Sequence, residues 1–114
     1  MQIDRISLGD SLTKLKLAGK LDINGAAAAE IPIALAAKNS RSVIIDMSEV
    51  SYVASLGVRH LVMAAKTLGR GGGKLVLFAA TEPVAEILTI MGITDLIPLA
   101  ASEAAALDLA APAA

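Results

Sequence analysis

Two kinds of apolar pattern alternate along this chain of 114 residues, and their alternation limits the fold more than any other feature. Residues 43–47 (VIIDM) and 74–78 (KLVLF) are short, mostly apolar runs, which are typical of central strands buried on both faces. Between them, apolar side chains recur at the spacing of one face of an α-helix: Val58, Leu61, Val62, Ala65 and Leu68. Strands that alternate with helices predict a mostly parallel sheet with right-handed crossovers.

Further elements are expected before and after this centre. Residues 2–8 and 12–18 alternate apolar and polar side chains on either side of a turn, which predicts an amino-terminal β-hairpin. Residues 82–91 have a second helical stripe. Residues 96–99 predict a short edge strand, and residues 102–109 predict a final helix capped by a serine. The predicted order is ββ-α-β-α-β-α-β-α.

The segment between the hairpin and the first buried run is less regular. Residues 24–38 are rich in alanine and predict a helix, with Asn24 as the expected N-cap. Pro32 lies inside this segment, so we expect a kink there or a helix that starts late. Glycines at 69–73 follow the central helix and precede a strand, which indicates a helix C-cap rather than a phosphate-binding loop. The fold class expected is α/β: a single mixed, mostly parallel sheet with an amino-terminal hairpin and about four helices.

Composition excludes several functions. The 10 Lys and Arg residues nearly balance the 11 Asp and Glu residues, and no basic face or tail indicates nucleic-acid binding. The chain has no cysteine and a single histidine, His60, which excludes disulfides, thiolate zinc sites and multi-histidine metal sites. Tyr52 and Phe78 are the only aromatic residues, too few for a platform on which bases or sugars stack. We therefore expect no cofactor and no metal.

The length and apolar content indicate one domain, which we expect to span residues 1–110 and to be followed by a disordered tail at 111–114. The amino terminus carries charges early and has no apolar h-region, so no secretory signal is expected. Charged residues interrupt every long apolar stretch, so direct membrane insertion is not expected either. These features predict a cytoplasmic protein, and no sequence signal specifies its oligomeric state.

Ser55 is the strongest candidate for a functional residue. It opens the central helix after a polar connection at 48–54. Free N–H groups and the helix dipole favour an anion at the start of a helix, so a phosphate on Ser55 would be tolerated there. The alternative is that Ser55 is simply the N-cap of this helix. Gly57 is costly in a first helical turn, which indicates that another backbone approaches closely there.

Further candidate residues lie near Ser55 or at predicted strand ends. Arg59, His60 and Met63 fall on the helix face away from the apolar stripe, where they would contact a partner or face solvent. Asp22 and Asp46 are each expected at the carboxyl end of a strand, the functional edge of α/β sheets. Either carboxylate could instead cap a neighbouring loop or helix.

A small hydrolase that uses Ser55 is an alternative of another class. His60 and Asp46 would then have to complete a Ser-His-Asp relay. A nucleophile elbow has the pattern G-x-S-x-G, and the segment 53–57 (VASLG) lacks its first glycine. A lone histidine off the apolar stripe is more often a surface residue. We therefore assign no catalytic residue.

Several segments, in order and at natural spacing, resemble the STAS-domain family, and within it the small single-domain anti-sigma factor antagonists. The resemblance runs from about residue 15 to residue 109. A strand that ends in Gly-x-Leu-Asp is matched at 19–22, and an apolar strand with Asp at 43–50 (VIIDMSEV). The signature loop, aromatic-x-x-Ser-x-Gly-apolar, is matched at 52–58. A glycine-rich break with a strand (GGGKLVLFAA) and a helix leading into x-Gly-apolar (EPVAEILTIMGITDLIPL) follow.

The resemblance implies a non-enzymatic binding switch. In this family the serine that matches Ser55 is phosphorylated by a partner that is both anti-sigma factor and serine kinase. The unphosphorylated form binds the partner, phosphorylation breaks the complex, and a phosphatase restores it. Many members have Asp immediately before this serine, where this chain has Ala54; the departure concerns residue 54 and leaves Ser55 intact. The expected partner contacts are Asp22, Tyr52, Ala54, Leu56, Gly57, Arg59, His60 and Met63.

The resemblance also allows a second class of function, because STAS domains similar to this one serve as accessory subunits of lipid-transport ATPases. The two classes differ in genomic neighbourhood. A gene for a serine kinase of the anti-sigma type would favour the antagonist, and genes for transporter subunits would favour the accessory subunit.

Overall fold

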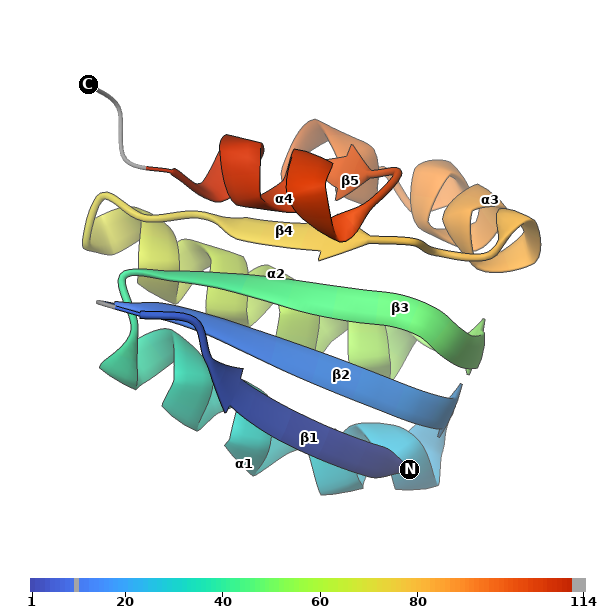
Figure 1. The fold of residues 1–114 in the computed structure, drawn as a ribbon. Helices are drawn as coiled ribbons and strands as arrows, with labels where there is room; N and C mark the ends of the chain where they lie inside the picture. The colour runs from blue at the N-terminus through green and yellow to red at the C-terminus, as the bar shows by residue number, and fades with distance from the viewer. Residues whose placement is uncertain (10, 112–114) are drawn as a thin grey trace.

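The computed structural model describes residues 1–9 and 11–111 and contains one five-stranded sheet, in which the strands follow one another in chain order (Figure 1). β1 is antiparallel to β2, and each later pair is parallel. The strands are β1 (Gln2–Ser7), β2 (Leu12–Leu21), β3 (Ser42–Val53), β4 (Leu75–Phe78) and β5 (Leu99–Ala100). The helices are α1 (Ile23–Asn39), α2 (Ser55–Arg70), α3 (Glu82–Ile90) and α4 (Glu103–Ala110), with a short 3-10 helix, η1 (Ile93–Asp95). The predicted fold class is confirmed, while residues 112–114 of the predicted tail lie outside the described residues.

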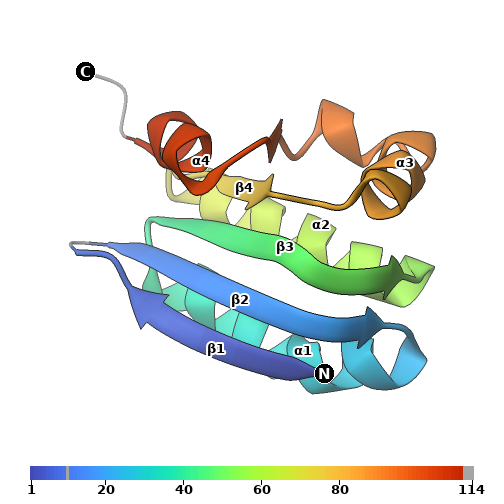
Figure 2. The same ribbon diagram turned by 45° about the vertical axis from the view of Figure 1, so that its right-hand side comes forward.

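The strand order determines which face each helix covers. Because successive parallel strands are added on the same side, right-handed crossovers place the connecting helices on one face of the sheet. α1 and α2 lie behind the sheet in Figures 1 and 2, and α3 adds Val84 and Leu88 to the same core. α4 follows the last strand and lies on the opposite face, against β4 and β3.

The core is divided unequally between the two faces. The larger cluster lies under α1, α2 and α3, and its largest buried side chains include Leu15, Leu17, Ile45, Met47, Leu61, Leu68, Leu77 and Leu88. The smaller cluster lies under α4 and consists of Ile44, Val76, Phe78, Ala106 and Ala110. Successive residues of β3 and β4 belong to alternate clusters, as the two-residue period of a strand requires. The runs at 43–47 and 74–78 are therefore adjacent buried strands, as predicted.

β2 shows the same alternation, with charges on the α4 side. Leu15 and Leu17 point into the larger core, and Lys14 and Lys16 point the other way. Lys14 forms an ion pair with Glu103 at the start of α4. Lys16 Nζ lies 3.4 Å from a carboxylate oxygen of Glu49 on β3. These two lysines are thus paired within the molecule.

β3 is longer than predicted. The segment expected to be a polar connection continues as strand to Val53. β4 pairs only with Val43–Asp46, so the rest of β3 has only β2 as a neighbour and exposes its polar side chains. The β2–β3 register shifts twice along this stretch, which is irregular pairing that a simple alternation pattern does not show.

Several predicted boundaries also differ. The N-cap of α1 is Asp22 rather than Asn24, and α1 continues as one helix past Pro32, so the prediction of a late start is wrong. Packing against the sheet sets helical structure more than local propensity does, which explains why one proline is tolerated. β5 is formed by residues 99–100 rather than 96–99. The predicted glycine C-cap of α2 is confirmed at Gly71, two residues later than Gly69.

Candidate functional site

The carboxyl ends of β2 and β3 bring two segments of the predicted site together. Leu21 pairs with Val53 in parallel, and the Ala54 backbone N–H donates a hydrogen bond to the Leu21 carbonyl oxygen at 2.8 Å. The residues after each strand therefore lie side by side. They line an open hollow of about 380 Å³, which we call the edge hollow: Asp22, Ile23, Asn24, Tyr52 and Ala54.

Ser55 directly follows the edge hollow as the first residue of α2, and its side chain is exposed. The interpretation of Ser55 as the N-cap is wrong, because Ala54 occupies that position in an extended conformation. Alanine has no side-chain acceptor, and the first turn of α2 has neither a side-chain cap nor an acidic residue. The N–H groups and the positive end of the helix dipole are thus left without a charged or side-chain acceptor next to Ser55.

Gly57 explains how closely α2 approaches the sheet. It is buried, and a Cβ atom placed on it would lie 2.5 Å from Leu21 Cγ and 2.7 Å from Leu21 Cδ2. A close approach therefore occurs inside the domain, between the first turn of α2 and the last residue of β2, but the nearest atoms belong to the Leu21 side chain and not, as expected, to another backbone. Gly57 contributes to the site by fixing the position of Ser55.

The two carboxylates have different surroundings. Asp22 Oδ1 accepts a hydrogen bond from the Gly25 backbone N–H at 2.9 Å, which confirms that it caps α1. Asp46 was expected at the carboxyl end of a strand. It lies inside β3 instead, because β3 continues past it. Its Oδ1 accepts from the Ser48 backbone N–H at 2.9 Å within the irregular part of β3. Asp22 is thus at the site and Asp46 is not.

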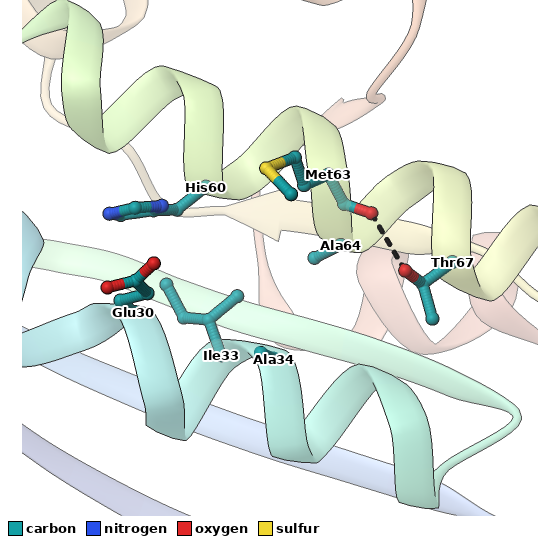
Figure 3. A pocket seen from close by; sticks show the side chains of 7 residues that line it. All are labelled: Glu30, Ile33, Ala34, His60, Met63, Ala64 and Thr67. Atoms are coloured by element: carbon teal, nitrogen blue, oxygen red, sulfur yellow. Dashed lines mark hydrogen bonds between the residues drawn. The ribbon is translucent and has the colours of Figure 1, made fainter.

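His60 does not face solvent as the helical stripe suggested. It is half-buried, turns toward α1 and lies near Glu30 and Ile33 (Figure 3). α2 packs against α1 as well as against the sheet, so its buried face is wider than the stripe at 58–68. Within the described part of the chain, no hydrogen bond joins Ser55, His60 and Asp46 into a relay.

The predicted partner contacts thus divide between two places. Asp22, Tyr52 and Ala54 line the edge hollow, where Leu56, half-buried, and Gly57 follow Ser55. His60 and Met63 line a different hollow between α1 and α2, and exposed Arg59 lies between the two places along the helix. Sequence reasoning missed Ile23, which is 72% exposed in the edge hollow. An isoleucine immediately after a capping aspartate, where a helix usually begins with polar residues, was the available signal.

The described residues lack two features that would indicate other kinds of protein. They contain no group of three or more His, Cys, Asp or Glu side chains that could hold a metal ion. No helix among them is long and apolar enough to cross a membrane.

Comparison with known proteins agrees with this geometry. The sequence matches the STAS domain over residues 5–106, and the chain belongs to the STAS-domain family. It is 34% identical over 87 residues to BtrV of Bordetella bronchiseptica strain RB50, which is named a candidate anti-sigma factor antagonist; the match covers 74% of this chain and 75% of BtrV.

Solved structures show the same fold. The anti-sigma factor antagonist SpoIIAA in its unphosphorylated form superposes with a TM-score of 0.80 at 18% identity, covering 95% of each chain. The phosphorylated form of SpoIIAA, a Bacillus cell fate determinant, gives a TM-score of 0.72 at 17% identity, covering 95% of this chain and 98% of that one.

Proposed function

We propose that this protein is an anti-sigma factor antagonist whose binding is switched by phosphorylation of Ser55. With Ser55 unmodified, it binds an anti-sigma factor that is also a serine kinase, and the sigma factor is released. A phosphate on Ser55 breaks this complex, and a phosphatase restores it. Membership of the STAS family and the similarity to BtrV support this proposal. The domain acts by binding and has no catalytic activity of its own.

The observation that carries the proposal is the exposed Ser55 hydroxyl at a helix start without a cap. A kinase can reach this hydroxyl, and the phosphate would lie beside unpaired N–H groups at the positive end of α2. Phosphorylation should therefore leave the fold unchanged. In the complex the same dianion would be buried against the partner, which is unfavourable unless the partner supplies a cation.

The edge hollow provides the surface on which the partner would dock. Tyr52 is 46% exposed and Ile23 is 72% exposed, so two large side chains offer apolar area next to Ser55. Asp22 uses one carboxylate oxygen to cap α1, and its other oxygen is available to a donor of the partner. Arg59, exposed one turn after Ser55, extends the surface along α2.

The test is calorimetric titration of the purified protein with an anti-sigma factor of the serine-kinase class from the same organism. Ser55→Ala should bind as the unmodified protein does, and Ser55→Asp should bind about 30-fold or more weakly, because a charge is desolvated in the interface. With ATP, intact mass should show one added phosphate on the wild type and none on Ser55→Ala.

Ser7→Asp is a matched control, because Ser7 is exposed at the opposite end of the sheet. It should bind like the wild type and should not prevent phosphorylation. Equal affinities for the wild type, Ser55→Ala and Ser55→Asp would reject the switch.

A further inference from the structure

A second hollow, which we call the α1–α2 groove, lies between the two helices (Figure 3). Its volume is about 120 Å³, and it shares no lining residue with the edge hollow. α1 forms one wall and α2 the other. The lining residues are Glu30, Ile33, Ala34, His60, Met63, Ala64 and Thr67.

Large apolar side chains are exposed on the two helices that form the groove, although only Met63 lines the groove itself. Met63 on α2 is 56% exposed, and on α1 Ile31 is 67% exposed and Leu35 is 49% exposed. Ile31 and Leu35 are four residues apart, so they lie on one exposed side of α1, beside the side that lines the groove with Glu30, Ile33 and Ala34. An exposed apolar strip bordered by charged residues is typical of a surface that binds another protein.

His60 adds a polar group that the free domain leaves unsatisfied. Its Nε2 atom is buried and has no hydrogen-bond partner among the described residues. Figure 3 shows the ring next to Glu30 and Met63 on the wall of the groove. A buried polar atom without a partner is unfavourable, and a bound segment that repacks Met63 could bring a partner to it.

The groove is lined by one charged residue, the acidic Glu30, whereas the charges on the neighbouring outer stripe of α2 are positive. The outer stripe of α2 contains, in chain order, Arg59, Met63, Lys66 and Arg70, at the spacing i, i+4, i+7 and i+11. α2 contains no acidic residue, and Glu30 is the only one in α1. In the part of the chain that the structure describes, none of these three cations forms an ion pair. These three cations are therefore available to pair with acidic groups of a partner.

We propose that the α1–α2 groove binds an acidic amphipathic helix of a partner protein. Apolar side chains of that helix, at a spacing of three and four residues, would cover Ile31, Leu35 and Met63. Acidic side chains beside them would pair with Arg59, Lys66 and Arg70. The proposal goes beyond the switch, because it does not require Ser55 and, apart from Arg59, uses residues outside the surface proposed for the anti-sigma factor.

The same observations disfavour other ligands. The groove is smaller than the pockets of about 300–1,000 Å³ that enclose small molecules. Exposed isoleucine, leucine and methionine contribute nothing to phosphate contacts, so a nucleic acid would leave the apolar strip uncovered. A protein helix satisfies both the apolar strip and the cations.

The test is an NMR titration of the isotope-labelled protein with designed peptides of about 16 residues, the length of α2. One peptide is amphipathic with leucine on one face and glutamate on the other; its counterpart has lysine in place of glutamate. The acidic peptide should shift the signals of Ala34, His60, Met63 and Thr67, and the lysine peptide should not. Binding should weaken as salt is raised, because the cations are exposed.

Variants separate this site from the switch. Met63→Asp should weaken binding of the acidic peptide at least tenfold, and Lys66→Glu about five- to tenfold. Lys16→Glu, a matched reversal on the opposite face of the sheet, should have no effect, and Ser55→Asp should have none either. Loss of the Ser55 switch with peptide binding retained would refute the proposed function and leave the groove proposal standing.

Three results would overturn the groove proposal. They are the absence of shifts with the acidic peptide, equal binding of both peptides, and shifts confined to the edge hollow at Tyr52 and Ala54. Sedimentation of the protein alone gives a further check. Self-association that Met63→Asp abolishes would assign the groove to a second copy of this chain and would also overturn the proposal.

Discussion

Both faces of the sheet bury apolar side chains and carry cations, but the cations of the two faces differ in whether they form ion pairs within the domain. On the α4 face, two lysines of β2 are paired within the domain, Lys14 with Glu103 and Lys16 with Glu49. On the other face, a larger core is covered by α1 and α2, and the cations on the outer side of α2 have no described ion-pair partner. The difference indicates that one face uses its charges for stability and the other leaves them available for binding.

The largest expected effect on stability follows from the difference in size between the two cores. Leu61 is fully buried in the larger core, whereas Leu107 on α4 is half-buried beside the smaller one. Leu61→Ala should lower the free energy of unfolding by roughly 2–5 kcal/mol. Leu107→Ala should cost only about 1 kcal/mol, because less apolar area is lost. Urea unfolding of both variants measures the difference, and equal losses would show that the two faces contribute equally.

Within α2, the inner and outer sides should respond oppositely to the same substitution. Gly57→Ala places a methyl group against Leu21, and overpacking of this kind costs roughly 1–3 kcal/mol. Gly69→Ala meets nothing within 4 Å and should stabilise the protein by up to about 1 kcal/mol through helix propensity. Thermal unfolding compares the two. If Gly57→Ala were also stabilising, α2 would not be held against β2 by close packing.

The smallest difference in stability is expected between removing the charge of a paired lysine and removing that of an unpaired one. Lys14→Met keeps the apolar stem and removes the charge that pairs with Glu103, so it should cost about 0.5–1 kcal/mol at low salt. Lys66→Met should change stability by less than about 0.5 kcal/mol, because its charge pairs with nothing described. Urea unfolding at low and high salt tests both, since salt should reduce only the Lys14 effect. A comparable loss in Lys66→Met would give Lys66 a structural role and remove it from the groove.

Local periodicity was sufficient to predict most of the fold. The helical stripe at 58–68 and the apolar runs at 43–47 and 74–78 identified α2, β3 and β4 because each pattern lies within one element. The far end of β3 was missed because its exposure depends on how far β4 extends beside it. A neighbour that is distant in the sequence leaves no periodic signal in the strand itself.

The candidate site was predicted less completely, for the same reason. Asp22 and Ala54 occupy the N-cap positions of their helices, where Asn24 and Ser55 were expected, because the end of the β2–β3 pairing sets where each helix starts. His60 was misplaced because its surroundings come from α1, which packs across from it. Residue types and motif spacing located the edge of the sheet that carries Ser55, while helix–helix packing determined the rest.

The strand order has a consequence for how the domain is made. Each strand pairs with the one synthesised immediately before it, so no strand has to wait for a later segment of the chain to find its place. Pairing of consecutive strands closes the shortest loops available to this topology, which favours rapid folding. The sheet can therefore grow strand by strand as the chain leaves the ribosome, and α4 completes it by covering the remaining face.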